Sequence, residues 1–254
     1  MWCLVMRRRA GLLVCAVLLL AGCAPPDASA GHVAAERYAA FWLWAGVEPQ
    51  AVVATAERLY LLQGERVPHR GEAVMQPLGP LPTAMNNDSV WLVFRSETID
   101  HTDEAVQRFV SAMLGAVQRW EHRGTDIDGV QIDFDARTYA LKEYADFLRR
   151  VRAAMPARYK LGITGLMDWA STGGVETLND LEGVLDEVVV QTYQGWHTVP
   201  DYAAYLPALA RLTLPFRVGL IQHGQWDAAW ETRLARNPAF RGCVVFLIND
   251  KVRL

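Results

Sequence analysis

Eight short runs of apolar and β-branched residues recur along the chain, and polar or helical-looking segments separate most of them. Runs of this length that are bounded by turn residues predict β-strands. They cover residues 41–47, 58–64, 90–95, 129–135, 160–169, 187–194, 216–224 and 242–250.

Two of the separating segments, 101–124 and 137–156, carry apolar residues at helical spacing. The apolar positions are Val106, Phe109, Val110, Met113 and Val117 in the first segment, and Leu141, Tyr144, Phe147, Leu148 and Val151 in the second. Strands that alternate with helices predict a parallel sheet. Eight such strands predict an α/β fold of the closed (β/α)8 TIM-barrel type across residues 32–254. An open doubly wound sheet is the alternative, although no glycine-rich nucleotide loop supports it.

Three stretches depart from a regular barrel pattern. Residues 68–88 are rich in Pro and Gly and predict a long loop where a helix is expected. Residues 33–41 predict a helix that covers one end of the barrel. Only Lys251–Leu254 follow the last run, so we expect the regular final helix to be lacking.

Residues 1–22 predict a secretory signal peptide. A basic start at Arg7–Arg9 precedes the apolar stretch Gly11–Leu20, which is too short to span a bilayer as a permanent helix. The Leu-Ala-Gly-Cys sequence that follows resembles the lipobox of bacterial lipoproteins. This resemblance implies that Cys23 is lipidated and that residues 23–31 form a tether. Ala24 stands where an inner-membrane retention signal carries Asp, which implies the periplasmic side of the outer membrane. An ordinary cleaved signal, with no role for Cys23, is the alternative.

Charge and cysteine content narrow the partners of the mature chain. Removing the three signal arginines from 25 basic residues leaves 22 against 28 acidic ones, and no Lys/Arg stripe is present. Nucleic acid is therefore not an expected partner. Cys243 is the one cysteine beyond the lipobox, and its apolar surroundings predict a core position without a disulfide. We expect no cofactor and no metal, because HExxH, paired Cys and zinc-like His spacing are absent from the sequence.

The segment DGVQIDFD, residues 128–135, places two acids on one face of a strand. Val130, Ile132 and Phe134 alternate with Gln131, Asp133 and Asp135. Residues two apart are separated by roughly 6.6 Å along a strand, so Asp135 is expected at the barrel mouth and Asp133 one layer deeper. Two such carboxyls couple, and we expect one to hold its proton near neutral pH, as a general acid requires. The alternative is that both acids bond to loop backbone or to an arginine and only shape the barrel end.

These residues resemble the fourth-strand signature of family 18 glycoside hydrolases, the chitinase-like enzymes. Asp128, Gly129 and Asp133 match that signature, whereas Gln131 replaces its first inner Asp and Asp135 replaces its catalytic Glu. The resemblance implies that Asp135 is the general acid and that Asp133 orients the acetamido group of the substrate, which acts as the nucleophile. It also implies an acetamido contact for Tyr193 in VVVQTYQG, with Gln131 and Gln191 completing the polar floor.

The chain also departs from that family. Asp is one methylene shorter than Glu, and VFRSET stands in place of the third-strand Ser-x-Gly-Gly. Phe246 or Leu247 replaces the eighth-strand Trp. As a whole, through GVQIDFDA and ITGLMDW, the chain resembles an uncharacterised family of bacterial lipoproteins, a domain of unknown function with a chitinase-like barrel. That family implies a fold and a location but no reaction.

Aromatic and polar residues at the predicted strand ends are further candidates for ligand binding. Flat aromatic faces stack on sugar rings, and Arg95 or Asp168 is placed to pair with an acid or to bond a ligand. The candidates are Trp44, Arg95, Asp168, Trp169, Trp196, His197, His223 and Trp226. Core packing, loop capping and structural hydrogen bonds are the alternatives for individual members, and Trp91 and Trp120 are expected in the core.

The sequence therefore predicts a lipid-anchored, glycoside-hydrolase-like protein that acts on cell-envelope or exported polysaccharide, such as an N-acetylhexosamine polymer. A second hypothesis is a catalytically inactive carbohydrate-binding lipoprotein in polysaccharide export or envelope assembly. A third is a hydrolase of neutral sugars in which Asp133 and Asp135 act as nucleophile and acid. The expected partners are a glycan and, through Cys23, the membrane.

Overall fold

The computed structural model describes residues 31–48, 50–69, 72–137, 140–170 and 173–249. The predicted signal peptide, Cys23 and most of the tether lie outside these residues. Within the described part of the chain, no helix is both long enough and apolar enough to cross a membrane.

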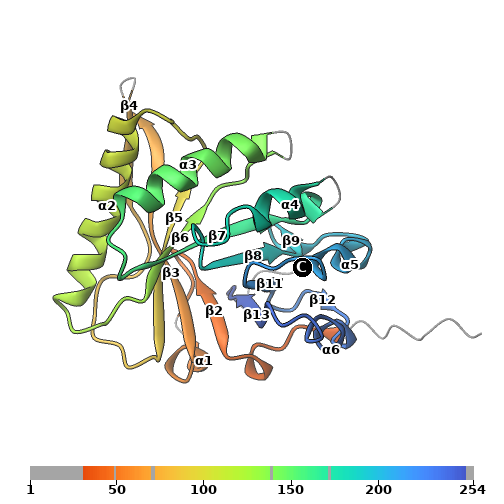
Figure 1. Cartoon of the computed structure of the whole chain (residues 1–254). Coiled ribbons are helices and arrows are strands. Elements are labelled where there is room, and N and C mark those ends of the chain that lie inside the picture. Colours follow the sequence, from red (N-terminus) through yellow and green to blue (C-terminus); the bar gives the residue numbers. More distant parts are fainter. Residues whose placement is uncertain (1–30, 49, 70–71, 138–139, 171–172, 250–254) are drawn as a thin grey trace, which may run out of the picture.

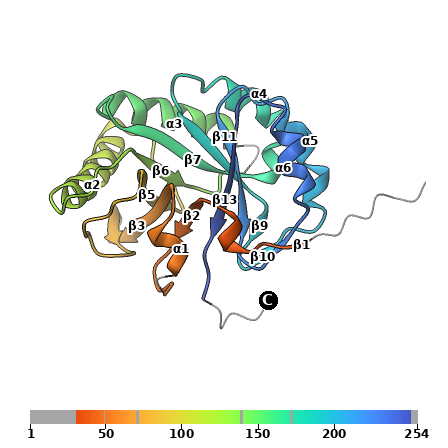
Figure 2. The same ribbon diagram turned by 90° about the horizontal axis from the view of Figure 1, so that it is seen from below.

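Eight parallel strands close into a barrel (Figures 1 and 2). They are β2 (Ala40–Leu43), β3 (Arg58–His69), β5 (Ser89–Ser96), β6 (Gly129–Asp133), β7 (Lys160–Leu166), β8 (Glu187–Gln191), β11 (Phe216–Ile221) and β13 (Phe240–Phe246). The last strand pairs with the first at Val245 and Phe41, and the first pairs with β3 at Ala40 and Arg58. All eight predicted strands are thus confirmed, and the closure rules out the open sheet.

Two tryptophans fill the barrel interior, and two glycines make room for them. A Cβ on Gly219 would lie 2.7 Å from the Trp42 ring, and a Cβ on Gly162 would lie 3.1 Å from the Trp91 ring. The interior of a barrel is a packed core, so large side chains on one strand require small ones on the strand they face.

The helices form an arc outside the strands, with α2 and α3 side by side on one flank and α4, α5 and α6 on the other (Figures 1 and 2). Their bounds are α1 Ala51–Ala54, α2 Asp103–Glu121, α3 Leu141–Ala154, α4 Gly174–Asn179, α5 Leu206–Leu209 and α6 Ala229–Leu234. Short 3₁₀ helices in the described segments include η1 Ala35–Arg37, η3 Met167–Ala170 and η4 Tyr202–Ala204. Both predicted long helices are confirmed. The Thr102 side chain caps α2 by accepting the N–H of Ala105.

Two local expectations were wrong. The predicted loop at 68–88 contains β4 (Glu72–Pro77), which pairs antiparallel with an extension of β3 beyond the barrel. The predicted helix at 33–41 is reduced to η1, because backbone hydrogen bonds hold Val33 to Gly224 and His223 and the chain enters β2 at Ala40. Residues 250–254, where a final helix was expected to be lacking, lie outside the described residues.

A buried ion cluster closes the N-terminal end of the barrel. The Glu187 carboxylate, whose side chain is 5% exposed, accepts Arg58 Nη1 at 2.9 Å and Arg217 Nε at 2.8 Å. The Tyr60 hydroxyl donates to the other carboxylate oxygen. Polar groups at this end are thus paired with one another, whereas the opposite end carries the candidate site.

Candidate functional site

Asp133 is the last residue of β6, at the C-terminal end of the fourth barrel strand. Its side chain is buried (8% exposed for the residue), and Oδ1 accepts the Thr164 hydroxyl of β7 at 2.6 Å. The strand was predicted to continue to Asp135, but the Ala136 N–H donates to the Phe134 carbonyl at 2.8 Å and the chain turns there. Asp135 therefore lies just beyond the strand, on an exposed turn.

Both acids line the same two cavities, of about 500 and 220 Å³. The larger cavity brings together many of the predicted site residues: Trp44, Arg95, Asp133, Asp135, Asp168, Gln191, Tyr193 and Phe246. The smaller one lies beside Arg95, Ser96, Glu97 and Phe134. The expected meeting of the acid pair with strand-end aromatics is thus confirmed, because parallel strands bring their carboxyl ends to one rim.

Burial and neighbouring charges perturb both carboxyls. Burial raises the pKa of Asp133 to about 6; the Thr164 hydrogen bond and Arg95 oppose this shift, and the Asp135 charge adds to it. Burial also raises the pKa of Asp135; Arg95 opposes this rise and Asp168 adds to it. The deeper acid is thus the one that holds its proton closer to neutral pH.

Arg95 stands between the two cavities with a half-exposed side chain. Its guanidinium forms a long ion pair with Glu65, with 3.6 Å between Nη1 and Oε1, so it is only loosely held. Instead of a direct ion pair with the acids, Arg95 exerts a through-space attraction that partly offsets the rise of both carboxyl pKa values on burial.

Gln131 lies one layer below the acids and does not line either cavity. It is fully buried, and its Oε1 accepts Trp42 Nε1 at 2.7 Å while Nε2 has no partner among the described residues. Gln131 was expected to complete the polar floor, but the structure places it beneath the cavities, because inward-facing strand residues below the rim are covered by the layer above them.

Tyr193 and Gln191 come from the end of the sixth barrel strand and line the larger cavity, as predicted. Tyr193 begins β9 (Tyr193–Gln194), and its ring packs 6.4 Å from Trp42 and 5.5 Å from Phe246. Burial raises the pKa of Tyr193 well above its usual value, and the Asp133 charge adds to the rise. The phenol is therefore a neutral donor at any ordinary pH.

Phe246 supplies the aromatic floor of the cavity. Its ring lies 5.1 Å from that of Trp44, and both line the larger cavity. The sequence left open whether Phe246 or Leu247 takes the place of the eighth-strand Trp. Leu247 is fully buried in the outer core, so Phe246 takes that place. The floor is thus made by a Trp from the end of the first strand together with a Phe from the eighth.

Two tryptophans were wrongly predicted to reach the mouth. Trp169 is 1% exposed, and its Nε1 donates to the Ala136 carbonyl at 2.8 Å, so it supports the acid-bearing turn from behind. Trp226 is buried and donates to Glu231 at 2.9 Å. The 3₁₀ turn of η3 directs Trp169 into the core and leaves Asp168 on the cavity side.

Trp196 and His223 were predicted to bind the same ligand as the acids, but they line a different cavity of about 450 Å³. This cavity also includes His197 and is bounded by the turn between β9 and β10 (His197–Thr198). Neither Trp196 nor His223 lines the acid-pair cavity, because that turn stands between the two spaces.

Sequence reasoning missed several contributors to the site, among them Thr164, Met167 and Tyr205. The Thr164 hydroxyl donates a hydrogen bond to Asp133. Thr164 lies two residues after Gly162, which faces the barrel interior beside Trp91, and alternate residues of a strand share a face, so its inward position could have been predicted. Met167 and Tyr205 line the acid-pair cavity. Tyr205 follows η4 in an irregular segment, and no sequence pattern places such a residue.

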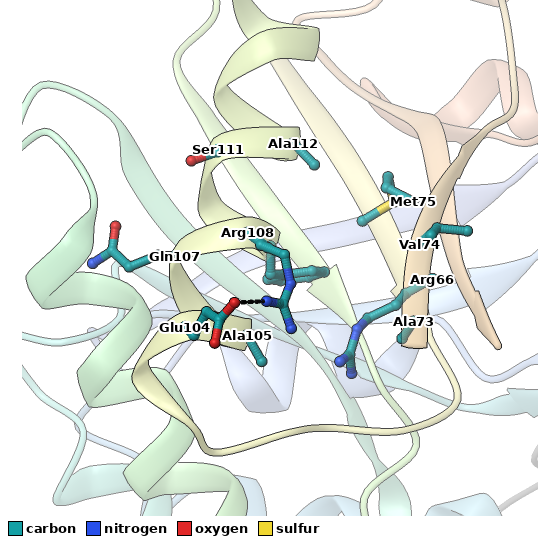
Figure 3. Close-up of a pocket in the computed structure, with 11 residues that line it drawn as sticks. Arg66, Ala73, Val74, Met75, Glu104, Ala105, Gln107, Arg108, Ser111 and Ala112 are labelled. Atoms are coloured by element: carbon teal, nitrogen blue, oxygen red, sulfur yellow. Dashed lines mark hydrogen bonds and ion pairs between the residues drawn. The ribbon is translucent and has the colours of Figure 1, made fainter. Parts of the chain in front are cut away.

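A cavity of about 540 Å³ lies elsewhere, between β4 and helix α2 (Figure 3). The Met75 side chain points toward the helix across it, whereas the Val74 side chain points away, and Glu104 of the helix is hydrogen-bonded to Arg108. It holds no pair of carboxyls, so the acid-pair cavity is the candidate site. No cluster of metal-ligating side chains occurs in the described segments.

Comparison with known proteins agrees with this architecture. Residues 97–209, which include the acid pair and Tyr193, match the family model described as Domain of unknown function (DUF3142). No curated protein has a matching sequence. The expected resemblance to an uncharacterised family with a chitinase-like barrel is confirmed, and its lipoprotein character stays a prediction.

Solved structures of similar fold are chitinase-like. A GH18 chitinase from Pseudoalteromonas aurantia superposes with a TM-score of 0.57 at 13% identity, covering 83% of this chain and 94% of that one. A putative chitinase A from Streptomyces coelicolor gives 0.52 at 12% identity, covering 82% and 91%. The xylanase–α-amylase inhibitor protein XAIP-I, in complex with trehalose, gives 0.55 at 10% identity, covering 82% and 92%. At these identities the likeness shows a shared fold.

Proposed function

We propose that this protein is a glycoside-hydrolase-like protein that acts on cell-envelope or exported polysaccharide, with Asp135 as the general acid. The observation that carries the proposal is the meeting of Asp133 and Asp135 in one aromatic-lined cavity at the C-terminal end of the fourth barrel strand. Paired acids in a cavity lined by Trp44 and Phe246 suit a sugar ring, whose C–H faces pack on aromatics while its oxygens meet carboxyls.

In the reaction we propose, the Asp135 carboxyl gives its proton to the glycosidic oxygen as the bond to the anomeric carbon breaks. The acetamido oxygen of an N-acetylhexosamine attacks that carbon, and water then opens the cyclic product while Asp135 takes a proton back. Asp133, held by Thr164, orients the acetamido N–H. Tyr193 donates to the acetamido oxygen. Asp is one methylene shorter than Glu, so the substrate must approach closer to the fourth strand.

We propose further that Cys23 carries lipid and holds the barrel at the periplasmic face of the outer membrane. Support comes from the Leu-Ala-Gly-Cys ending of the apolar leader and from the Ala that follows it. The short tether would keep the barrel close to the membrane surface and to envelope polysaccharide. Labelling cells with a radioactive or alkyne-bearing fatty acid, with Cys23→Ala as the control, tests the attachment.

The second candidate function is carbohydrate binding without catalysis, as in polysaccharide export or envelope assembly. Arg95 favours it, because this cation opposes the rise of the Asp135 pKa on burial, and a smaller rise leaves less of the protonated form that a general acid needs. One structural neighbour that is named as an inhibitor protein was solved with trehalose, so this fold is compatible with a role other than hydrolysis.

The deciding experiment incubates the protein, freed of its predicted signal and lipid, with a panel of envelope and exported polysaccharides. Released oligosaccharides are measured by mass spectrometry, and Asp135→Asn runs in parallel. Products from the wild type alone support the hydrolase and name its substrate. A thermal shift with one glycan in both proteins, without products, supports the binding protein. Equal product from both proteins would remove Asp135 from its role.

A further inference from the structure

The cavity of about 450 Å³ beyond the β9–β10 turn is built from three segments that are far apart in the sequence. They are His32 of the N-terminal strand β1 (Gly31–His32), residues 196–202 in and around β10, and residues 223–225, where the chain passes from β11 into β12 (Gln225–Trp226). The residues that matter for its chemistry are His32, Trp196, His197, Asp201, Tyr202 and His223. The acid pair takes no part in it.

Backbone strain is concentrated at this cavity. Asp201 has a φ of 56° and His223 a φ of 64°, and they are the only non-glycine residues with positive φ in the described chain. Left-handed backbone is costly for residues with a Cβ, and such residues persist where the surrounding structure imposes them, often at functional sites. Both of these side chains line the same cavity.

Hydrogen bonds hold the walls of the cavity in place. Thr198 Oγ1 accepts the Gln225 N–H at 2.9 Å and donates to the Gln225 carbonyl at 3.2 Å, which ties the β9–β10 turn to the next loop. His32 Nδ1 lies 2.9 Å from the His223 carbonyl oxygen, which ties in the N-terminal strand. A concave site with walls already ordered loses little entropy when a ligand binds.

The lining chemistry suits a sugar ring. Trp196 is 47% exposed, a large flat apolar face that burial against a ligand would stabilise. Around it stand imidazoles, the Asp201 carboxylate and the Thr198 hydroxyl, which are hydrogen-bonding groups for hydroxyls. The histidines and acids of the described residues are not clustered as metal ligands, so a metal does not account for this set.

We propose that this cavity is a second carbohydrate-binding site, in which a sugar ring stacks on Trp196 and bonds to His223 and Asp201. The site adjoins the acid-pair cavity, because Val199 lines both and the Trp196 ring packs 6.2 Å from that of Phe246. One oligosaccharide can therefore lie across the β9–β10 turn and occupy both sites. The proposal rests on the proposed function only for the identity of its ligand.

The test uses a hexasaccharide of β-1,4-linked N-acetylglucosamine and the Asp135→Asn protein. The chain has 6 histidines, and three of them, His32, His197 and His223, line this cavity. We expect the imidazole proton resonances of these three to shift on titration, whereas those of His69, His101 and His122 stay in place. Assignment follows from single His→Gln substitutions.

Calorimetry with the same hexasaccharide measures the contribution of the site. Trp196→Ala is expected to weaken binding by about tenfold, the effect of a single aromatic stacking contact of about 1.4 kcal/mol. His223→Gly removes the imidazole but suits the left-handed backbone, so binding is expected to fall while the melting temperature does not. Trp230→Ala, on α6 and outside both cavities, is the matched control and is expected to bind normally.

The outcomes separate this site from the proposed reaction. Unshifted His32, His197 and His223 resonances, or unchanged affinity in both Trp196→Ala and His223→Gly, overturn the second site even if the wild type cleaves the hexasaccharide. Shifted resonances and weakened binding support the second site even if the wild type releases no product. Absence of any binding by the Asp135→Asn protein overturns the second site, and the polysaccharide panel then judges the hydrolase by itself.

Discussion

The Thr164 hydroxyl donates a hydrogen bond of 2.6 Å to the Asp133 carboxylate, from β7 to β6 across the barrel rim. Thr164 thus holds the deeper acid of the pair directly. Without it, the buried carboxylate would have only the distant attraction of Arg95 to offset the cost of burial. This contact therefore helps to decide how far the deeper acid is ionised.

Replacing Thr164 by Val is expected to raise the pKa of Asp133 above its wild-type value of about 6, because the shape is kept while the donor that favours the charged form is lost. The pKa is measured by NMR titration of the Asp133 carboxyl carbon. Thr198→Val, which lies in the other cavity, serves as the control. A fall in the Asp133 pKa would contradict the role of the hydroxyl.

Asp133→Asn is expected to stabilise the fold at pH 8. The native pKa is raised from 3.8 to about 6, so the native state binds more protons than the unfolded state between these values. The contribution of Asp133 to stability therefore falls as pH rises through this window, and above pH 6 the ionised carboxyl costs on the order of 3 kcal/mol. Asn removes that cost.

The measurement for Asp133→Asn is urea unfolding at pH 4 and at pH 8. The gain in unfolding free energy is expected to be large at pH 8 and near zero at pH 4, where the wild-type carboxyl is mostly protonated in the native state. An equal gain at both pH values would mean that burial of charge is not its cause.

Asp135→Glu is expected to raise turnover if the protein is a hydrolase with a short acid, because the added methylene brings the carboxyl closer to the glycosidic oxygen. The rate of proton transfer depends on the distance between the carboxyl and the glycosidic oxygen, and a change of one bond length affects it. Initial rates of oligosaccharide release measure the effect. Asp168→Glu in the same cavity is the control, and its rate is expected to stay at or below that of the wild type.

Glu187→Gln is expected to destabilise the protein by about 3 kcal/mol, because it leaves the Arg58 and Arg217 guanidiniums near a neutral side chain inside the barrel end. Urea unfolding at neutral pH gives the value. Glu176→Gln breaks an exposed ion pair with Arg211 and is expected to cost less than about 1 kcal/mol. Equal effects of the two changes would argue against a structural role for the buried cluster.

Gly219→Ala is expected to destabilise the barrel by about 1–3 kcal/mol, because the new methyl group would lie 2.7 Å from the Trp42 ring. Combining it with Trp42→Phe is expected to recover part of the loss, since the smaller ring makes room. Thermal unfolding of the single and double variants tests this coupling. A purely additive loss would show that the two positions do not compete for space.

Much of the site was readable before the fold was known. The alternation in DGVQIDFD put polar residues on one face of a strand, and the order of runs placed the strand fourth in a closed barrel. Together these predicted that Asp133 and Asp135 face the barrel mouth. The resemblance to family 18 glycoside hydrolases added Tyr193 and Gln191, which line the same cavity as the two acids. Periodicity is a local property of the chain, so it can be read from the sequence without knowing which segments pack together in the fold.

The residues whose positions were predicted wrongly have a common explanation, which is that their positions depend on tertiary packing. Trp169 and Gln131 lie at strand positions that look suitable, yet a 3₁₀ turn directs the first into the core and an upper layer of side chains covers the second. Trp196 and His223 are near the right strand ends, but the β9–β10 turn separates them from the acids. Loop geometry and layer depth depend on packing between distant segments.

The sequence by itself determined the eight strands, the barrel order and the two acids on one face, because these follow from repeating patterns within short segments. The assembled fold, by contrast, settles that Trp44 and Phe246 line the acid-pair cavity while Trp169 does not, and that a second cavity with Trp196 stands beside the first. Those features depend on which side chains exclude water from one another, and water exclusion is a property of the assembled fold.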